Sequence, residues 1–497
     1  MSKVVIIGSG LGGLSCGYIL QRNGYDVTIL EQGWQIGGCL QCFKRRGAKF
    51  ETGMHYIGSA ADGQTIDRMM HYLELDRSVT LSALDSSAYN TVNLAGREYR
   101  FPNGREAFIE QFSSYFPHEH EALVRYMDII EGIASASTLG SLTSEGRDVA
   151  IESDYFTRSM DSVLDELFES DELKSVLAGD IPLYAGERGK TPFSQHAFIM
   201  NFYNKSAFRI VGGSDSIALS LAESIKVKGG QVLANKRVVK ICCDDTKATA
   251  VETDSGELYP ADYVISTIHP TRLLELLDTK LIRPAFRNRI TNIPQTTSGF
   301  VVYVKFKPQT MPYMNTNYFG YRGTTPWGCE DYTAESWPKG FLYMHMCHKA
   351  DAEWAESGVV ISYMKMADVA EWQGTKIGRR GAEYEAFKRS HAEKLIAEVD
   401  RMCPGFADSI ECYYTSTPLT YQDYTGTEAG SLYGVAKDIT LGAAGRVPYR
   451  TKVPNLLLAG QSVNSHGFLG VIVGSIVTCS ELVDPKLIYN QINEANR

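Results

Sequence analysis

The fold is decided near the amino terminus, where residues 4–31 read VVIIGSGLGGLSCGYILQRNGYDVTILE. The run opens with apolar residues typical of a short buried strand, and the small and apolar residues that follow predict a helix over 11–21 that ends near Gly24. A second apolar run over 27–31 predicts another strand. The stretch therefore predicts a β-α-β unit, the start of an α/β fold.

The turn between the first strand and the helix carries four glycines, at Gly8, Gly10, Gly12 and Gly13. Together they contain the pattern G-x-G-x-x-G, in which the first glycine allows the tight turn, the second lets backbone approach a pyrophosphate and the third lets helix and strand pack closely. Glu31, at the end of the second strand, is placed to accept hydrogen bonds from ribose hydroxyls. We therefore expect a dinucleotide at the start of the helix, whose positive dipole end faces the phosphates.

The residues after the second strand distinguish NAD from FAD. Gln32 follows Glu31, and Gly37-Gly38 and Gly53 come next, where a nicotinamide dehydrogenase would continue with further β-α units. Glycines at these places let loop backbone press against a longer, extended cofactor. The sequence therefore favours FAD over NAD, with these residues among its contacts.

Composition excludes several classes of protein. The 497 residues are 44% hydrophobic and 22% charged, as in an ordinary globular chain that is too long for one core. The net charge of -9, with no concentration of Lys or Arg, argues against nucleic acid as a partner. The apolar run after Lys3 imitates a signal peptide, but its glycines sit at turn spacing, so we expect a cytoplasmic protein. Without about twenty uninterrupted apolar residues, any membrane contact would be peripheral.

Periodicity along the rest of the chain predicts interleaved domains. Helices are expected over 104–116, 119–135, 158–178, 213–226 and 379–402 and from Gly470, with a hairpin around Ala95-Gly96 and strands over 232–241, 262–267, 300–306, 341–347, 359–364 and 456–459. The expected fold class is α/β. Residues 1–60, 206–297 and 440–497 would form a Rossmann-type FAD-binding domain of the GR2 kind. Residues 61–205 and 298–439 would form a mixed α+β substrate domain that carries a helical insertion. The two domains would interleave along the chain.

The sequence resembles the phytoene desaturase, carotenoid isomerase and retinol saturase group of the flavin amine oxidase superfamily. The segments that carry the resemblance are 4–58, 212–238, 262–267 and 455–474, and His55-Tyr56-Ile57-Gly58 is most similar to the retinol saturase and carotenoid isomerase branch. The resemblance implies an FAD-dependent oxidoreductase that acts on carbon-carbon bonds of a lipophilic polyene or isoprenoid-like substrate, by saturase, desaturase or isomerase chemistry. It also implies a separate electron donor or acceptor.

The same resemblance implies roles for residues near the carboxyl terminus. Val238 resembles the position whose backbone touches adenine, and Gly460 begins the motif that runs under the ribityl chain and the flavin. Gln461 stands where many relatives carry an acidic residue. The last helix would present its amino terminus to the flavin ring, stabilising negative charge on the reduced ring. The residues that would bring it there are Gly467, Gly470 and Val471.

Three residues are candidates for proton transfer. His55 and Tyr56 follow Gly53, where the chain should return to the cofactor, and His466 precedes Gly467. Histidine can deliver or remove a proton near neutral pH, as saturation of a double bond requires after hydride transfer. The alternative is that His55 hydrogen-bonds buried backbone and Tyr56 packs beneath the ring.

Cys39 and Cys42 support a rival interpretation, a flavin-dithiol reductase, because C-x-x-C is a redox spacing. Reductases of that kind carry a longer spacing and a second G-x-G-x-x-G, and the nearest later candidate, residues 442–445, has the wrong pattern. We therefore interpret the pair as packed thiols. A flavin-bound protein without turnover is a second alternative that the sequence leaves open.

Further side chains are weighed as ligands. His345 and His348 lie three apart on an expected strand, which would point them to opposite faces, so we expect no metal site. Aromatic and methionine residues away from the glycine motifs could line a channel for a polyene, although each is individually typical of ordinary core. These residues are Phe198, Met200, Phe202, Tyr203, Phe300, Tyr303, Tyr343, Met344 and Met346.

Overall fold

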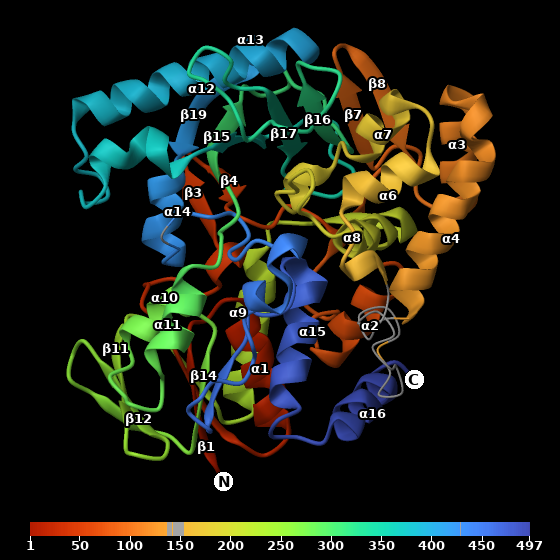
Figure 1. The fold of residues 1–497 in the computed structure, drawn as a ribbon. Helices are drawn as coiled ribbons and strands as arrows, with labels where there is room; N and C mark the ends of the chain where they lie inside the picture. The colour runs from red at the N-terminus through yellow and green to blue at the C-terminus, as the bar shows by residue number, and fades with distance from the viewer. Residues whose placement is uncertain (137–141, 143–153, 428) are drawn as a thin grey trace.

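The computed structural model describes residues 1–136, 142, 154–427 and 429–497. Figure 1 shows one lobe around the amino-terminal β-α-β unit and a second lobe around a larger sheet. In the first lobe, β1 (Lys3–Ile7), α1 (Leu11–Arg22) and β2 (Asp26–Leu30) fold as predicted. β1 pairs in parallel with both β2 and β14 (Tyr263–Ser266), at the centre of the sheet.

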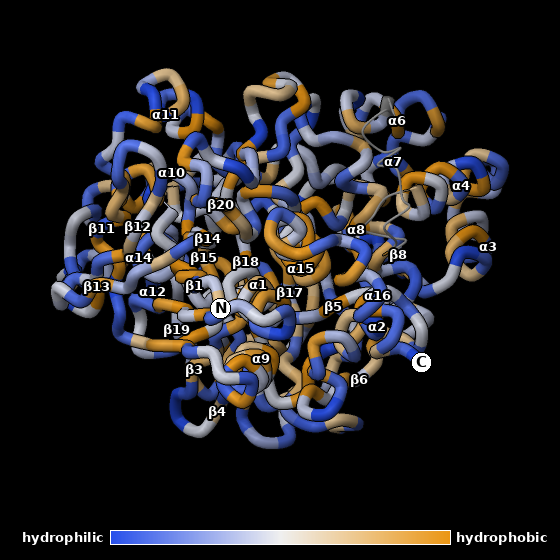
Figure 2. The backbone as a smooth tube through the Cα atoms, turned by 90° about the horizontal axis from the view of Figure 1, so that it is seen from below, coloured by the Kyte–Doolittle hydropathy of each residue, from blue (hydrophilic) through white to orange (hydrophobic). Residues whose placement is uncertain are grey.

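The first lobe is built on five parallel strands in the order β10-β2-β1-β14-β20, completed by β10 (Gln231–Leu233) and β20 (Leu456–Leu458). Parallel sheets are covered on both faces, and the strand residues of β1 from Val4 onward are accordingly buried. α9 (Asp215–Val227) and α15 (Gly467–Cys479) both pack on α1. α15 is apolar around its circumference, and Figure 2 colours most of it as hydrophobic, which fits a helix buried on all sides.

Two expected boundaries in this lobe are wrong. The single strand expected over 232–241 is two strands in different sheets, because the chain turns at Asn235, whose φ is 55°. The second of them, β11 (Val238–Cys243), forms an antiparallel sheet with β12 (Ala248–Thr253) and β13 (Leu258–Pro260). The last helix begins at Gly467 instead of Gly470.

Short elements connect the lobes. β3 (Cys42–Arg45) and β4 (Ala48–Glu51) form a hairpin, and β5 (Ile57–Gly58), β9 (Ala207–Ile210) and β6 (Leu81–Ala83) form a small sheet in that order. α2 (Thr65–Tyr72) packs on α16 (Pro485–Ala495). α10 (Pro270–Glu275) and α11 (Pro284–Thr291) pack on one another after β14.

The second lobe is a seven-stranded sheet in the order β19-β15-β18-β17-β16-β7-β8, in which only β16 and β7 pair in parallel. Its strands are β7 (Asn90–Leu94), β8 (Arg97–Phe101), β15 (Ser298–Phe306), β16 (Asn317–Tyr321), β17 (Gly340–His345), β18 (Ser357–Met364) and β19 (Ile410–Ser416). The hairpin expected around Ala95-Gly96 joins β7 to β8.

Both faces of this sheet are covered. Residues such as Phe300 and Val302 pack in the core beneath α12 (Ala382–Met402), whereas the alternate residues Val301 and Tyr303 pack toward the helical insertion. The insertion consists of α3 (Arg105–Tyr115), α4 (His120–Ala136), α6 (Met160–Leu167), α7 (Asp171–Leu177) and α8 (Phe193–Lys205). The single helix expected over 158–178 is wrong, because Ser170 caps a new helix by accepting from the Leu173 amide.

The two large sheets draw on different parts of the chain. The five parallel strands come from within 1–60, 206–297 and 440–497, and the seven-stranded sheet comes from within 61–205 and 298–439. The domain boundaries themselves stay a prediction. Over the described residues, no helix is long and apolar enough to cross a membrane.

Candidate functional site

The glycine turn leaves open space in front of α1. Gly8 adopts a φ of 99°, and its N–H donates to the Leu30 carbonyl at 2.9 Å. A Cβ on Gly13 would lie 2.0 Å from the Gly8 oxygen, whereas a Cβ on Gly10 would have no described atom within 4 Å. Because Gly10 caps a helix whose first N–H groups need partners, this space suits a phosphate.

Glu31 closes the turn from the end of β2. Its carboxylate accepts hydrogen bonds from the Ser9 amide at 3.0 Å, the Ser9 hydroxyl at 2.7 Å and the Gly33 amide at 2.8 Å. A carboxylate has about four lone-pair sites, so it retains capacity for a ribose hydroxyl. Gln32 beside it is exposed.

The next glycines pack against this turn. The Gly37 amide donates to the Ser9 carbonyl at 3.1 Å, and a Cβ on Gly38 would lie 3.1 Å from the Gly10 Cα. From the other end of the chain, Gly460 approaches so closely that a Cβ on Gly12 would lie 3.1 Å from its Cα. The glycine segments thus form one cradle of exposed backbone that fits an extended dinucleotide.

A cavity of about 270 Å³ runs from this cradle into the second lobe. All three candidates for proton transfer line it, as do the expected flavin contacts Gly37, Gly53, Gly467, Gly470 and Val471. The cavity lining does not include Gly8, Gly10, Gly12, Gly13, Glu31, Gln32, Gly38, Val238 or Gly460. The residues of the glycine turn therefore lie apart from the three candidates for proton transfer. This separation fits a long cofactor whose phosphates lie at the turn and whose reactive ring lies at the cavity.

The far wall of the cavity is apolar and aromatic. Of the nine residues considered for a channel, Phe198, Phe202, Tyr203 and Met344 line it, whereas Met200, Phe300, Tyr303, Tyr343 and Met346 are packed in the cores. The sequence analysis missed several of the sheet residues that line it: Tyr321, Leu342, Ile361 and Tyr363. Alternation was the available signal, because residues two apart on a strand share a face. In the described part of the chain, no Asp, Glu, Lys or Arg lines the cavity.

Three tyrosine hydroxyls fix one edge of this wall. Tyr321 donates to the Gly179 carbonyl at 2.6 Å, Tyr363 to the Ile181 carbonyl at 3.4 Å and Tyr433 to the Pro182 carbonyl at 2.8 Å. Tyr363 and Tyr433 bond to residues of the short helix η5 (Ile181–Leu183), and Tyr321 bonds to Gly179 just before it. Because Tyr321 and Tyr363 lie on β16 and β18, this segment is attached to the sheet. The width of the cavity at this edge is therefore set by hydrogen bonds as well as by packing.

His55 and Tyr56 each carry a buried polar atom that finds no hydrogen-bond partner among the described residues: His55 Nδ1 and the Tyr56 hydroxyl. The Tyr56 ring packs on Tyr203 with centroids 4.6 Å apart, and burial raises the pKa of Tyr56 well above its usual value. Because native buried polar groups nearly always have partners, the Tyr56 hydroxyl is available to a ligand, whereas His55 Nδ1 lies 3.7 Å from Glu51 Oε2.

His466 caps α15 and lies against Tyr433, with ring centroids 4.7 Å apart. Burial, reinforced by the nearby Lys437, lowers the pKa of His466 to about 4. The ring is therefore neutral at pH 7, and this low pKa makes it a weak base.

Asp180 is a buried carboxyl that the sequence analysis missed. It directly precedes η5 and is 4% exposed, and burial raises its pKa to about 7. His196 Nδ1 lies 3.9 Å away and shares a hydrogen bond with the Tyr184 hydroxyl, while His196 Nε2 shares one with the Tyr126 hydroxyl. A lone aspartate in a helical region gives no sequence signal of such burial.

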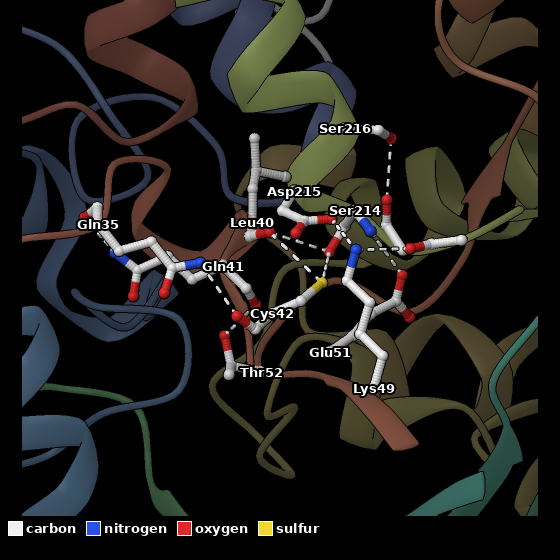
Figure 3. Close-up of polar contacts among 12 residues, drawn as sticks. Gln35, Leu40, Gln41, Cys42, Lys49, Glu51, Thr52, Ser214, Asp215 and Ser216 are labelled. Atoms are coloured by element: carbon white, nitrogen blue, oxygen red, sulfur yellow. Dashed lines mark hydrogen bonds and ion pairs between the residues drawn. The ribbon is translucent and has the colours of Figure 1, made fainter. Parts of the chain in front are cut away.

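The cysteine pair differs from a redox dithiol. Cys39 lines the cavity, but Cys42 is buried with its Sγ 3.7 Å from the Ser214 hydroxyl (Figure 3). Burial and the neighbouring Glu51 raise the pKa of Cys42 to about 12, so its nucleophilic thiolate form is scarce at neutral pH. Both thiols are free. The histidines His345 and His348 bond to Met314 and Ser357, and no metal-binding group of three side chains occurs among the described residues.

Comparison with known proteins agrees with this architecture. The chain is 27% identical to human all-trans-retinol 13,14-reductase, over 98% of this chain and 86% of that protein. It is 23% identical to the chloroplastic prolycopene isomerase 1 of an Oncidium hybrid cultivar, over 97% and 84% of the two chains. An oxidoreductase from Methanosarcina mazei has a similar fold, with a TM-score of 0.63 and 16% identity over 96% of this chain and 100% of that one.

The sequence profile of the family described as flavin containing amine oxidoreductase matches residues 11–371, most of the chain. That range contains the helix of the glycine turn, most of the cavity residues of the second lobe and β17 at the centre of the seven-stranded sheet, whereas β1 precedes it. The chain therefore belongs to the flavin containing amine oxidoreductase family, as an oxidoreductase with FAD as its cofactor.

Proposed function

We propose that this oxidoreductase acts on carbon-carbon bonds of a lipophilic polyene or isoprenoid-like molecule. One observation carries the proposal: the same cavity is lined by the expected flavin segments, such as Gly53 and Gly467, and by apolar side chains of the second lobe, such as Phe198 and Leu342. A long apolar substrate in this cavity would lie against the reactive ring. The relatives named for a retinol reductase and a prolycopene isomerase support the same substrate class.

The charge of the lining favours an uncharged substrate over an amine. Within the described residues the lining contains no carboxylate that would offset a buried ammonium group. Transferring an unpaired charge from water into an apolar cavity costs free energy. Transferring an uncharged polyene is favourable, because its apolar surface is removed from water and contacts aromatic rings. The family description therefore sets the cofactor and the fold, while the cavity favours another substrate class.

The proposed cofactor contacts follow the cradle. The helix end at Gly10 would hold the pyrophosphate, Glu31 and Gln32 the ribose and Val238 the adenine. The backbone around the ribityl chain and ring would come from Gly8, Gly12, Gly13, Gly37, Gly38, Gly53, Gly460, Gly467, Gly470 and Val471. When bound, FAD supplies a hydride acceptor or donor at its N5 atom. We also propose the domain boundaries given above, with FAD held by 1–60, 206–297 and 440–497.

The chain itself would position the substrate, exclude water and move one proton. Tyr321, bonded to Gly179, and Tyr363, bonded to Ile181 of η5, would hold the wall on which the substrate lies. His55, Tyr56 and His466 are the proposed groups for the proton. Oxidation requires a group that accepts the proton, and saturation requires a donor. With a pKa of about 4, His466 is neutral at pH 7 and would be a weak acceptor, which is suited only to oxidation.

The test is anaerobic turnover of the FAD-loaded protein after chemical reduction. All-trans-retinol and a cis-carotene are added separately, flavin reoxidation is followed by absorbance, and products are identified by mass spectrometry. A product heavier by two hydrogens indicates saturation, and one of unchanged mass with altered retention indicates isomerisation. Leu342→Trp, which would narrow the cavity, should reduce turnover while retaining FAD. A result with neither flavin reoxidation nor a new product from either polyene, or equal turnover of a saturated alcohol of the same length, would refute the proposal.

Delivery of such a substrate motivates two further proposals. The protein would contact membranes peripherally to collect a lipophilic substrate, and a separate redox partner would supply or remove electrons. Flotation with liposomes tests the first, and a soluble protein fraction that turns over a polyene without vesicle association would contradict it.

A further inference from the structure

The carboxyl group of Glu51 is buried at the end of β4, where its residue is 2% exposed. One of its oxygens, Oε1, accepts a hydrogen bond from the Ser214 amide at 2.9 Å, and Figure 3 shows Glu51 with Ser214 and Cys42 at the start of α9. This bond fixes the carboxylate but occupies only one oxygen. The second oxygen is left to another partner.

That second oxygen, Oε2, lies 3.7 Å from His55 Nδ1. Both side chains are nearly enclosed, with 3% of Glu51 and 9% of His55 exposed, and Nδ1 has no hydrogen-bond partner within the described chain. Since Nδ1 faces Glu51, the remaining ring nitrogen, Nε2, is the one left for the cavity that His55 lines.

Arg209 completes the charge balance of this pocket. Its residue is 2% exposed, and its guanidinium donates to the His55 carbonyl at 3.5 Å and to the Thr316 carbonyl at 3.0 Å. Burial raises the pKa of Glu51, while His55 and Arg209 oppose that rise. A cation beside a buried carboxylate favours its ionised form.

We propose that Glu51 is the positioning residue of His55: its carboxylate accepts the Nδ1–H hydrogen bond and thereby presents Nε2 to the substrate. The proposal rests on the proposed function, because it assigns His55 a proton transfer in the same cavity. The hydrogen bond a histidine makes at one nitrogen decides which nitrogen is available for chemistry. The 3.7 Å separation is longer than a hydrogen bond, as is common for catalytic pairs before the substrate binds.

The step balances for reduction of a double bond. Reduced FAD, when bound, would supply a hydride to one carbon, and the proton on Nε2 of the His55 imidazolium would bond to the other. The two new C–H bonds hold four electrons, two from the hydride and two from the broken π bond, and the cofactor would be left oxidised by two electrons. His55 is left as a neutral imidazole that still donates its Nδ1–H to Glu51. Desaturation is the reverse of this step.

Glu51→Gln separates this role from the structural one. Glutamine keeps an oxygen for the Ser214 amide, but replaces Oε2 with an NH₂ group that donates instead of accepting. The variant should therefore move the proton of neutral His55 from Nδ1 to Nε2. Glu119→Gln is the matched control, because Glu119 is 7% exposed and its Oε1 accepts from the Glu169 and Ser170 amides without a histidine partner.

The tautomer is read by ¹⁵N NMR of the FAD-loaded protein labelled at histidine, with the His55 signal assigned by its loss in His55→Gln. The wild type should show Nδ1–H and Glu51→Gln should show Nε2–H. The kcat for polyene reduction should fall by about 10²-fold or more, with KM and FAD content within about twofold. Glu119→Gln should change neither the tautomer nor kcat.

A wild-type His55 that carries its proton on Nε2 would overturn the proposal, and so would a Glu51→Gln variant with unchanged kcat. If Glu51→Gln does not fold, the wild-type spectrum alone decides between the two tautomers. Failure of the wild type to turn over any polyene would refute the proposed function, and the tautomer would still show whether Glu51 orients His55. The two failures are therefore distinguishable.

Discussion

Replacing Gly13 with Ala should separate α1 from the glycine turn, because the new Cβ would lie 2.0 Å from the Gly8 carbonyl oxygen. Carbon and oxygen atoms approach to about 3.3–3.6 Å even in favourable contacts, so the backbone would have to move by roughly 1.3 Å or more. This carbonyl accepts a hydrogen bond from the Thr267 hydroxyl at 3.2 Å, and the Ser9 amide of the same peptide donates to Glu31 at 3.0 Å, so the peptide cannot yield cheaply. Overpacking of this kind costs about 1–3 kcal/mol, which lowers Tm by a few degrees.

Gly10→Ala is the matched variant, which should lose FAD binding without losing stability. Its backbone, with φ of -65° and ψ of 177°, suits alanine, and no described atom lies within 4 Å of the new methyl group. The cofactor-free protein should therefore keep its stability. FAD binding should be lost, because the methyl group would occupy the place of the pyrophosphate.

The assay compares each variant with wild type after removal of FAD. Tm is measured by scanning calorimetry, and FAD is then titrated back and the bound fraction measured by flavin absorbance after gel filtration. Wild-type affinity for FAD in Gly10→Ala would show that the pyrophosphate lies elsewhere. An unchanged Tm in the cofactor-free Gly13→Ala protein would refute the close approach of α1 to the turn.

Three further predictions concern the cysteine pair, the buried Asp180 and the candidates for proton transfer. Replacing Cys39 and Cys42 together by Ser should leave flavin content intact and the rate of flavin reduction by substrate within about twofold, since the Cys42 pKa of about 12 leaves little thiolate; loss of turnover with flavin bound would support the dithiol interpretation. Asp180 keeps its proton in the folded state up to about pH 7 but loses it above 3.8 when unfolded, so this residue's contribution to stability is lost as pH rises between these values. Asp180→Asn should accordingly be more stable than wild type at about pH 8, by about 1–4 kcal/mol, and differ little near pH 4, as urea unfolding at both pH values would show. Tyr56→Phe or His466→Gln should lower kcat at least about tenfold without loss of FAD; normal rates in both would exclude these side chains from proton transfer.

The first lobe could be predicted in detail because its signals are local. The apolar runs of β1 and β2 and the glycines between them specify a β-α-β unit within thirty residues, whatever the rest of the chain does. Strand boundaries that depend on a single backbone angle were not predicted from the sequence. The positive φ of Asn235, which ends β10 and starts β11 in another sheet, leaves no trace in the apolar pattern of 232–241.

The cavity was predicted only in part because its walls come from distant segments. Its sheet wall combines residues of β16, β17 and β18, such as Tyr321, Leu342 and Tyr363, and no local pattern reveals which strands lie side by side. The same limit hid the contact of Glu51 with Ser214, which lies on another element far along the chain. Residues such as His55 and His466 were recognisable because they adjoin glycine motifs.

The order of strands in the parallel sheet also has a consequence for biosynthesis. β1 is made first, but its neighbour β14 follows some 260 residues later and β20 only near the end, where Leu458 pairs with Ser266. At about 5–20 residues per second, the nascent β-α-β unit waits for tens of seconds with an open edge before the sheet closes. The edge of β14 and the apolar surface under α15 must be shielded during that interval. FAD retention should therefore depend on chaperone capacity during expression, and the flavin site should be among the last parts of the molecule to form.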